Sequence, residues 1–346
     1  MSVVLDPARS AVNVEILLRI CGRRGRILVL MQDNPDPDAI ASAMAVRELV
    51  RQRLNKRVTI GYGGVLGRAE NRAMVHELRV ATRQIEPGQV KDFTTLCLVD
   101  TQPRAGNNAL LRSRPAEIVI DHHIPARGIP WRAELRDVRT EYGSSSAILY
   151  EYVVAAGLKP STNLATALFY GIETDTQELG REASRADIDT FQALVPLADA
   201  RKLARIRRAP MSPEYLAIFR DGLSNAVVAG STAISLIRGC TNPDVFAEVA
   251  EMILRVDGVR SSVCYGPCGD IIHLSARAAD AQGNAAYRMK RVVSRLGTGG
   301  GHRSMAGGQI PATGDVEKRL RLVHSRLLKY FARTRNCRPL LPKVPR

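Results

Sequence analysis

The sequence lacks the long hydrophobic runs of membrane-spanning proteins and has few of the aromatic residues with which many single-strand binders stack bases. No apolar run reaches the ~18 residues that a transmembrane helix needs, so we expect no membrane partner. Aromatic residues make up 5% of the 346 residues, and there is one tryptophan. A surface that stacks nucleic-acid bases, as many single-strand binders use, is therefore not expected.

Cysteines are few, and they do not form the two closely spaced pairs that a zinc site needs. "CYGPC" (264–268) has no partner pair at zinc-ligand spacing, so a hairpin with two thiols is favoured over a metal site. Reduced thiols fit this scatter better than a disulfide framework. The first 26 residues also lack the pattern of a secretory signal, which predicts a cytoplasmic protein. The six cysteines are Cys21, Cys97, Cys240, Cys264, Cys268 and Cys337.

Positive charge is abundant and unevenly distributed. The formal net charge is +16, and residues 313–346 carry ten Lys or Arg against two acidic residues, which is half of that excess. A second cluster, "RKLARIRR" (201–208), adds five more cations. Two interpretations stay open: a solubilising surface with a disordered tail, or a surface that contacts nucleic acid.

The first half of the chain alternates short apolar runs with helical periodicity. The runs bounded by polar or Gly/Pro residues read as buried strands, and residues 40–50 repeat apolar positions at helical spacing. Further helices are expected at 69–80, 144–156 and 163–176, with "GSSSA" (143–147) as a helix N-cap rather than a phosphate site. This alternation predicts an α/β fold with a parallel sheet and helices on both faces. The expected strands are "RILVLM" (26–31), "RVTIGY" (57–62), "TTLCLVD" (94–100) and "AEIVID" (116–121).

The length predicts more than one domain, and the pattern changes after about residue 197. Prolines and the basic run favour linker helices, and strand-rich segments with two helices follow, which predicts a smaller α/β domain. The expected divisions are a first domain at 1–197, linker helices at 198–222, a second domain at 223–330 and a basic tail at 331–346.

Acidic residues follow the expected strands at the edge where ligands of parallel sheets bind. Several carboxylates in one cleft repel one another unless they bind protons or cations. Oxygen ligands with one or two imidazoles favour Mn²⁺ or Mg²⁺ over Zn²⁺, and about four carboxylates balance two such ions. Paired divalent ions indicate phosphoester hydrolysis. The residues concerned are Asp36, Asp38, Asp100, Asp121, His122, His123 and Asp175.

At these residues the sequence resembles the DHH phosphoesterase superfamily. This group includes RecJ-like exonucleases, oligoribonucleases (nanoRNases) that also act on 3′-phosphoadenosine 5′-phosphate, cyclic-dinucleotide phosphodiesterases and exopolyphosphatases. The ordered matches are "QDNPDPDAIAS" (32–42), "LVDTQ" (98–102), "IDHH" (120–123) and "GIETDT" (171–176), followed by "LSAR" (274–277) and "GTGGGH" (297–302) of a DHHA1-type second domain.

The resemblance implies a role for each matched residue. Asp36 and Asp38 are similar to ligands of two Mn²⁺ or Mg²⁺ ions, and Asp100 to the carboxylate that bridges them. His122 and Asp175 resemble ligands of the second ion. The expected catalytic residues are Asp100, His123 and Asp121. His123 would lie near the scissile phosphate, and Asp121 would hold a neighbouring imidazole or the loop. In the second domain, the residues that resemble substrate-binding groups are Arg277, Gly300, Gly301 and His302.

One position departs from the family pattern. Most members begin the first motif with a histidine, and this chain has Gln32. An amide oxygen can bind Mn²⁺ or Mg²⁺, but it is a neutral and weaker donor than imidazole. We therefore expect the first metal site to bind weakly, to prefer Mg²⁺ or to fill only with substrate.

The leading hypothesis is a cytoplasmic phosphoesterase that hydrolyses short RNA or DNA oligonucleotides, or 3′-phosphoadenosine 5′-phosphate, by metal-hydroxide attack. One alternative keeps the chemistry and changes the substrate to a cyclic dinucleotide or polyphosphate. Another is a nucleotide-binding regulatory protein whose catalysis Gln32 has weakened. The oligomeric state stays open, with a homodimer as one option.

Overall fold

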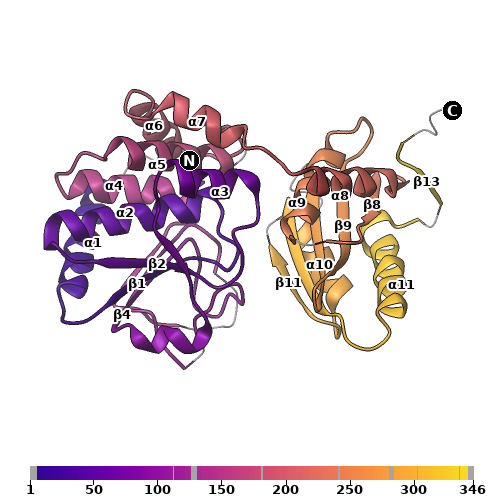
Figure 1. Cartoon of the computed structure of the whole chain (residues 1–346), viewed down its shortest axis with the longest axis horizontal. Helices are drawn as coiled ribbons and strands as arrows, with labels where there is room; N and C mark the ends of the chain where they lie inside the picture. Colours follow the sequence, from indigo (N-terminus) through magenta and orange to yellow (C-terminus); the bar gives the residue numbers. More distant parts are fainter. Residues whose placement is uncertain are drawn as a thin grey trace. The chain divides into compact units, whose positions relative to one another are not determined.

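The chain divides into two units, Met1–Ala209 and Pro210–Arg346, which are described separately below. The computed structural model describes residues 6–111, 113–125, 131–180, 182–240, 242–279, 284–301, 303–334 and 336–341. Both units pair a sheet with helices, which confirms the predicted α/β fold (Figure 1). The division falls inside the segment 198–222 that the sequence predicts as linker helices.

The first unit is built on a parallel sheet of six strands in the order β3-β2-β1-β4-β5-β6. The central strands are apolar along their whole length because both faces are covered. Ile27 and Val29 pack on one face of β1, whereas Leu28 and Leu30 pack on the other. The strands are β1 (Ile27–Leu30), β2 (Val58–Tyr62), β3 (Thr82–Gln84), β4 (Thr95–Val99), β5 (Ile118–Asp121) and β6 (Leu135–Val138).

The sequence predicts helices on both faces of this sheet, but in the described residues the α-helices cover one face only. The short 3-10 helix η1 (Pro87–Asp92) with neighbouring loops covers the other face. Helix α2 packs against both α4 and α5 and begins directly after the loop that follows β1. Asp36 caps α2 by accepting a hydrogen bond from the Ala39 N–H, and Pro37 occupies its first turn. The helices are α1 (Pro7–Cys21), α2 (Pro37–Leu54), α3 (Ala69–Glu77), α4 (Ser145–Ala155), α5 (Thr162–Asp175), α6 (Arg185–Leu194) and α7 (Ala200–Arg207).

A buried ion network fixes the turn between β6 and α4. The Arg139 side chain is fully buried and donates hydrogen bonds to the carboxylates of Asp137 and Glu151. The Tyr142 hydroxyl also donates to Glu151. Because a buried charge needs a partner, these contacts hold the backbone of residues 139–142 in one position. That backbone contributes to the site described below.

The second unit has a mixed sheet of seven strands in the order β11-β12-β10-β9-β8-β7-β13. Strands β8 and β9 run parallel, and the other neighbouring pairs run antiparallel. The strands are β7 (Val227–Ala229), β8 (Thr232–Leu236), β9 (Ser261–Cys268), β10 (Ile271–Ala278), β11 (Thr298–Gly301), β12 (Met305–Pro311) and β13 (Cys337–Pro339). β13 belongs to the segment predicted as a basic tail and pairs with β7 at the sheet edge.

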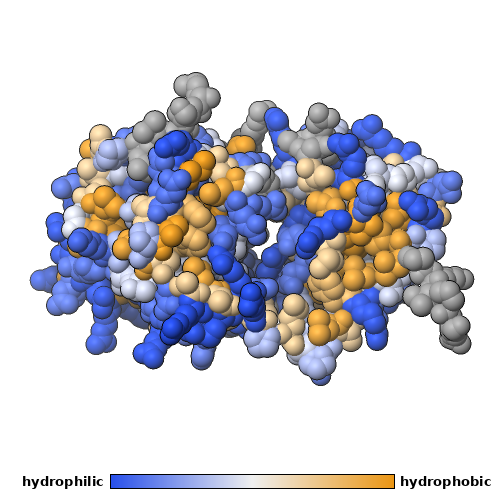
Figure 2. Space-filling model, turned by 90° about the horizontal axis from the view of Figure 1, so that it is seen from above, coloured by the Kyte–Doolittle hydropathy of each residue, from blue (hydrophilic) through white to orange (hydrophobic). Residues whose placement is uncertain are grey.

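Helices cover both faces of the second sheet. Helices α8 (Pro213–Ser224) and α9 (Asp244–Leu254) pack on one face. Helices α10 (Ala285–Val293) and α11 (Val316–Leu327), with the short π-helix η3 (Leu328–Ala332), pack on the other. In the described parts of the chain, every helix is too short or too polar to cross a bilayer. Figure 2 shows hydrophilic residues beside patches of hydrophobic ones on the visible face of the chain.

Candidate metal centre

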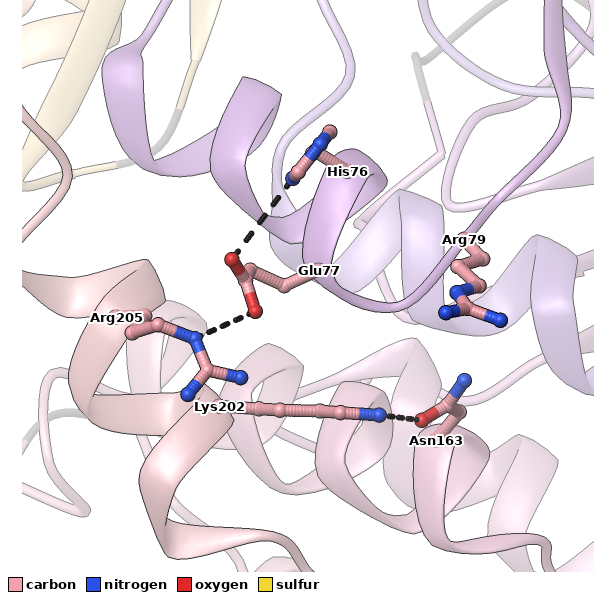
Figure 3. A pocket seen from close by; sticks show the side chains of 6 residues that line it. All are labelled: His76, Glu77, Arg79, Asn163, Lys202 and Arg205. Carbon is pink, nitrogen blue, oxygen red and sulfur yellow. Dashed lines mark hydrogen bonds and ion pairs between the residues drawn. The ribbon is translucent and has the colours of Figure 1, made fainter.

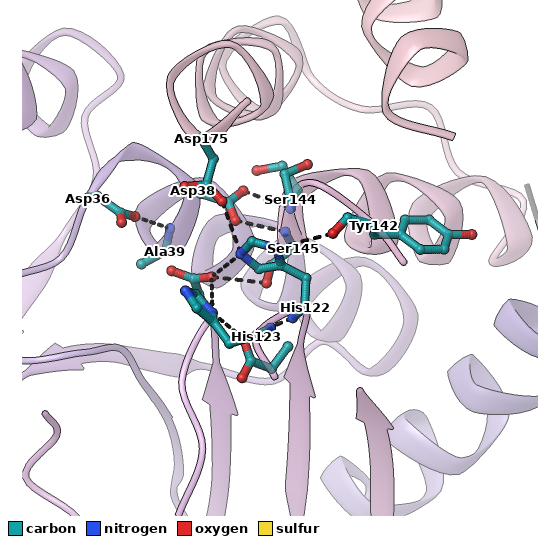
Figure 4. A network of polar contacts seen from close by, with 12 residues as sticks. Asp36, Asp38, Ala39, His122, His123, Tyr142, Ser144, Ser145 and Asp175 are labelled. Atoms are coloured by element: carbon teal, nitrogen blue, oxygen red, sulfur yellow. Dashed lines mark hydrogen bonds and ion pairs between the residues drawn. The ribbon is translucent and has the colours of Figure 1, made fainter. Parts of the chain in front are cut away.

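Acidic and histidine side chains from separate parts of the first unit meet at the carboxyl ends of its central strands (Figure 4). Asp100 follows β4 directly, and His122 follows β5. The last residue of α5, Asp175, reaches the same place. His122 Nε2 lies 3.4 Å from Asp100 Oδ1 and 3.0 Å from Asp175 Oδ2. The order of strands thus brings together residues that are far apart in the sequence.

Among the described residues, two overlapping groups of side chains could hold a metal ion. One comprises Asp38, His122 and Asp175, and the other comprises Asp100, Asp121, His122 and His123; within each group the ligand atoms lie within 4.8 Å of one another. Oxygen atoms with one or two imidazole nitrogens form a ligand set that suits Mn²⁺ or Mg²⁺.

The surroundings of Asp100 fit a bound cation. Its side chain is buried, and Oδ2 accepts no hydrogen bond from any residue that the structure describes. A buried carboxylate oxygen without a donor is costly, and a divalent ion removes that cost. The Asp100 backbone has φ of 57°, a left-handed conformation that non-glycine residues rarely adopt. Such backbone geometry is concentrated at functional sites.

The N-terminus of α4 holds two of the acids. Asp38 accepts hydrogen bonds from the backbone N–H groups of Ser145 (2.7 Å) and Ser146 (2.8 Å). The Ser145 hydroxyl donates to Asp100 Oδ1 at 3.1 Å. The partial positive charge of the helix end favours both carboxylates. The sequence marked "GSSSA" as a helix start, but nothing in it indicated these contacts.

Hydrogen bonds orient both imidazoles. His122 Nδ1 lies 3.3 Å from the Tyr142 carbonyl oxygen, which can accept a hydrogen bond from it. In this orientation Nε2 faces Asp100 and Asp175. His123 Nδ1 lies 2.8 Å from Asp121 Oδ1, which also accepts the backbone N–H groups of both histidines. Asp121 therefore holds both the His123 ring and the loop.

The pKa values of the site reflect crowded negative charge. Burial and the charges of Asp100 and Asp175 raise the pKa of Asp36 to about 7. Burial opposes charge on His122, but Asp175 and Asp100 outweigh it and raise its pKa well above the usual range. Burial and the charge of His122 oppose charge on His123, but the hydrogen bond to Asp121 and the charges of Asp100 and Asp121 together outweigh them and raise its pKa to about 9. Protons and metal ions relieve the same repulsion.

Asp36 lies to one side of both candidate groups (Figure 4). Its Oδ1 accepts the Ala39 N–H, and its Oδ2 accepts a hydrogen bond from Gln32 Nε2 at 2.9 Å. Asn107 Nδ2 lies 3.5 Å from Gln32 Oε1. Gln32 thus directs its N–H₂ group at the Asp36 carboxylate and its oxygen at Asn107. Sequence reasoning did not identify Asn107 as part of the site.

The predicted substrate-binding residues lie in the second unit. Arg277 is on β10, opposite Met305 of β12, and its guanidinium pairs with Glu251 at 2.9 Å. Gly300 and Gly301 are on β11, where Gly301 faces Ala306 of the same strand β12. Arg277 and Gly301 thus lie at the same end of the sheet, on either side of β12. His302 lies outside the described residues.

Ser145→Ala is expected to weaken Mn²⁺ binding by about tenfold, because groups that orient metal ligands typically contribute 10- to 100-fold. The variant keeps the backbone N–H to Asp38 and removes the hydroxyl that donates to Asp100. Isothermal titration with Mn²⁺ measures the change. Ser146→Ala is the matched control, because the Ser146 hydroxyl makes no hydrogen bond with the described residues. Equal affinities in the two variants would contradict the role of Ser145.

Comparison with known proteins identifies both units. Residues 26–172 match the model of the DHH family, N-terminal domain, and residues 230–329 match that of the DHHA1 domain. An uncharacterised protein of Methanocaldococcus jannaschii is 33% identical over 290 residues, which cover 84% of this chain and 59% of that protein. The chain thus spans less than two thirds of the length of this curated relative.

Solved structures share the fold at low sequence identity. An exopolyphosphatase-related protein from Bacteroides fragilis is similar with a TM-score of 0.71 and 17% identity, covering 92% of this chain and 96% of that one. RecJ in complex with Mn²⁺ from Thermus thermophilus has a TM-score of 0.55 and 16% identity, covering 97% of this chain and 56% of that one. With its DHH domain followed by a DHHA1 domain, the chain belongs to the DHH family, as its motifs predicted.

Proposed function

We propose that this chain is a divalent-metal-dependent phosphoesterase that hydrolyses short oligonucleotides or a related nucleotide phosphate such as 3′-phosphoadenosine 5′-phosphate. The observation that carries the proposal is the convergence of Asp38, Asp100, His122 and Asp175 at one sheet edge. The buried Asp100 oxygen without a donor among the described residues supports a cation there.

The side chains have distinct tasks in this reaction. Asp38, Asp100, His122 and Asp175 would hold divalent ions, which supply a hydroxide nucleophile at neutral pH and polarise the phosphoryl oxygens. The pKa of His123, raised to about 9, keeps its ring charged at neutral pH, and about a third of its side chain is exposed. A charged imidazole held by Asp121 can stabilise negative charge that develops on the phosphoryl group.

The charge of the second unit supports a phosphate-rich substrate. Residues 210–346 carry 20 Lys or Arg against 10 Asp or Glu, a net charge of +10. Exposed cations gather on α10, α11 and η3, and polyanions bind such surfaces with release of counter-ions. These side chains are Lys290, Arg291, Lys318, Arg321 and Lys329.

A turnover panel tests the proposal. Dinucleotides, cyclic dinucleotides, 3′-phosphoadenosine 5′-phosphate and polyphosphate are each incubated with Mn²⁺ or Mg²⁺, and product is quantified by chromatography. We expect release of mononucleotides from the linear dinucleotides, or of phosphate from the bisphosphate, and no reaction in EDTA. Turnover confined to the cyclic dinucleotides or polyphosphate would move the substrate to those classes, and no turnover of any compound contradicts the proposal.

A second function, nucleotide binding without turnover, is favoured by one contact. The Gln32 amide donates a hydrogen bond to Asp36 Oδ2, and the Asp36 carboxylate lies outside both candidate groups. Metal content separates the two functions: two ions per chain with substrate present supports the enzyme, whereas one ion or none with tight nucleotide binding supports the regulator.

Stabilisation by Mn²⁺ should increase with pH. Asp36 and His123 have pKa values raised to about 7 and about 9, so the metal-free folded state binds more protons than the unfolded chain. The stability that these protons provide is present at low pH and is lost as pH rises through 7 and 9. Mn²⁺ replaces the protons, so the shift in melting temperature on adding Mn²⁺ should be larger at pH 8 than at pH 5.5. Equal shifts at both pH values would contradict this view of the site.

A further inference from the structure

A pocket lined by polar side chains lies in the first unit, at the far end of α5 from the metal centre (Figure 3). Its volume is about 420 Å³, within the roughly 300–1,000 Å³ range of small-molecule sites. Residues 163 and 175 stand near opposite ends of α5, about 18 Å apart at the rise of an α-helix. The pocket is lined by His76, Glu77 and Arg79 at the end of α3, Asn163 of α5, and Lys202 and Arg205 of α7.

The lining carries more positive than negative charge. Arg205 Nε donates to Glu77 Oε2 at 2.7 Å, so these two charges offset each other. The Lys202 ammonium group donates to the neutral amide oxygen of Asn163 and forms no ion pair with a described carboxylate, although the backbone N–H and the charge of Lys202 help to lower the pKa of Asp199. The Arg79 guanidinium makes no hydrogen bond or ion pair with any described residue. Two cations without an ion-pair partner among the described residues therefore remain.

These two cations lie on the same side of the pocket. Figure 3 shows the Lys202 ammonium group and the Arg79 guanidinium on either side of the Asn163 amide, with the paired Arg205 and Glu77 opposite. A guanidinium fork beside an ammonium point charge suits the oxygens of a phosphate group. Divalent cations are disfavoured in such surroundings, and the volume leaves room for a nucleoside beside the phosphate.

We propose that this pocket binds the phosphate group of a small molecule, either inorganic phosphate or a nucleoside monophosphate, independently of the metal centre. The ligand would bridge α3 and α7. Helix α7 ends two residues before Ala209, where the first unit ends, so binding would stabilise the helix that leads to the second unit. The proposal gives "RKLARIRR" (201–208) a specific partner, and it does not depend on hydrolysis.

The test is calorimetric titration of the full chain with AMP and with inorganic phosphate in EDTA. The double variant Arg79→Asn/Lys202→Gln removes both of these charges. Asparagine tolerates the left-handed backbone of Arg79 (φ 54°), and glutamine keeps a donor near Asn163. Lys91→Gln/Arg185→Gln is the matched control, because it removes two exposed charges of the same unit outside the pocket. Melting temperatures verify that all variants fold.

We expect AMP to bind in EDTA, inorganic phosphate to compete with it, and the double variant to weaken AMP binding at least tenfold while the control binds as the parent chain does. Asp100→Asn should bind AMP normally in EDTA, which separates this site from the proposed hydrolytic activity. Unchanged binding in the double variant, no AMP binding in EDTA, or AMP binding without competition from phosphate would each overturn the proposal.

Discussion

Asp100→Asn is expected to lower metal-dependent hydrolysis by roughly 10³-fold or more, because metal ions supply several kcal/mol of charge stabilisation and each ~1.4 kcal/mol is a factor of ten. Asp100 is a buried acid that directly follows strand β4 and lies 3.4 Å from His122 Nε2, and its Oδ2 has no hydrogen-bond donor in the described chain. The amide of asparagine keeps the shape of the side chain and removes its charge. Retained hydrolysis would remove the main support for the proposed function.

The measurement is turnover of a linear dinucleotide with saturating Mn²⁺, together with Mn²⁺ binding by titration. Asp33→Asn is the matched control, since Asp33 follows the same strand β1 but belongs to neither candidate metal group. We expect it to stay within about threefold of the parent chain, because the half-buried Asp33 side chain makes no hydrogen bond or ion pair with the described residues, and changes away from such networks have small effects. If Asp33→Asn were as damaging as Asp100→Asn, a general loss of negative charge would explain both results.

The sheet and its acidic edge could be predicted because they follow from local patterns. Leu28 and Val29 point to opposite faces of β1, so a strand covered on both sides is apolar throughout and stands out in the sequence. Parallel strands present their carboxyl ends at one edge, and this places Asp100 and His122 together without knowledge of any side-chain contact.

Contacts across long sequence separations could not be predicted in this way. Asp38 meets the Ser145 N–H 107 residues along the chain, and the pairing depends on where α4 begins relative to α2. The neighbour of Gln32 is Asn107, from a loop without regular structure. Likewise, Lys202 and Arg79 lie on different elements, and neither the basic run nor composition shows that they share a pocket.

The predicted basic tail illustrates a different difficulty. Cys337, Arg338 and Pro339 pair with β7 as an edge strand, although their sequence has no alternation of apolar and polar residues. A short edge strand is stabilised by backbone hydrogen bonds and needs no buried face, so residue pattern carries little information about it.

Gln32→His is expected to tighten the binding of Mn²⁺ at the first metal site, beside Asp36, by about 10- to 100-fold. In the structure, the Gln32 N–H₂ group donates to Asp36 and holds that carboxylate in a hydrogen bond instead of leaving it available to a metal. A histidine can present a ring nitrogen as a ligand, and imidazole binds Mn²⁺ more strongly than an amide oxygen does. The second ion, which Asp38, His122 and Asp175 would hold, should be little affected.

Mn²⁺ titration followed by electron paramagnetic resonance measures both ions, because free and bound Mn²⁺ give different signals. Gln32→Leu is the control, since it removes the hydrogen bond to Asp36 without adding a ligand. If release of Asp36 alone were sufficient, Gln32→Leu would tighten Mn²⁺ binding at the first site as much as Gln32→His does. Superimposable titrations of the parent chain and Gln32→His would show that Gln32 does not limit metal binding, and the cause of a weak first site would then lie with Asp36 itself, whose Oδ1 is committed to capping α2.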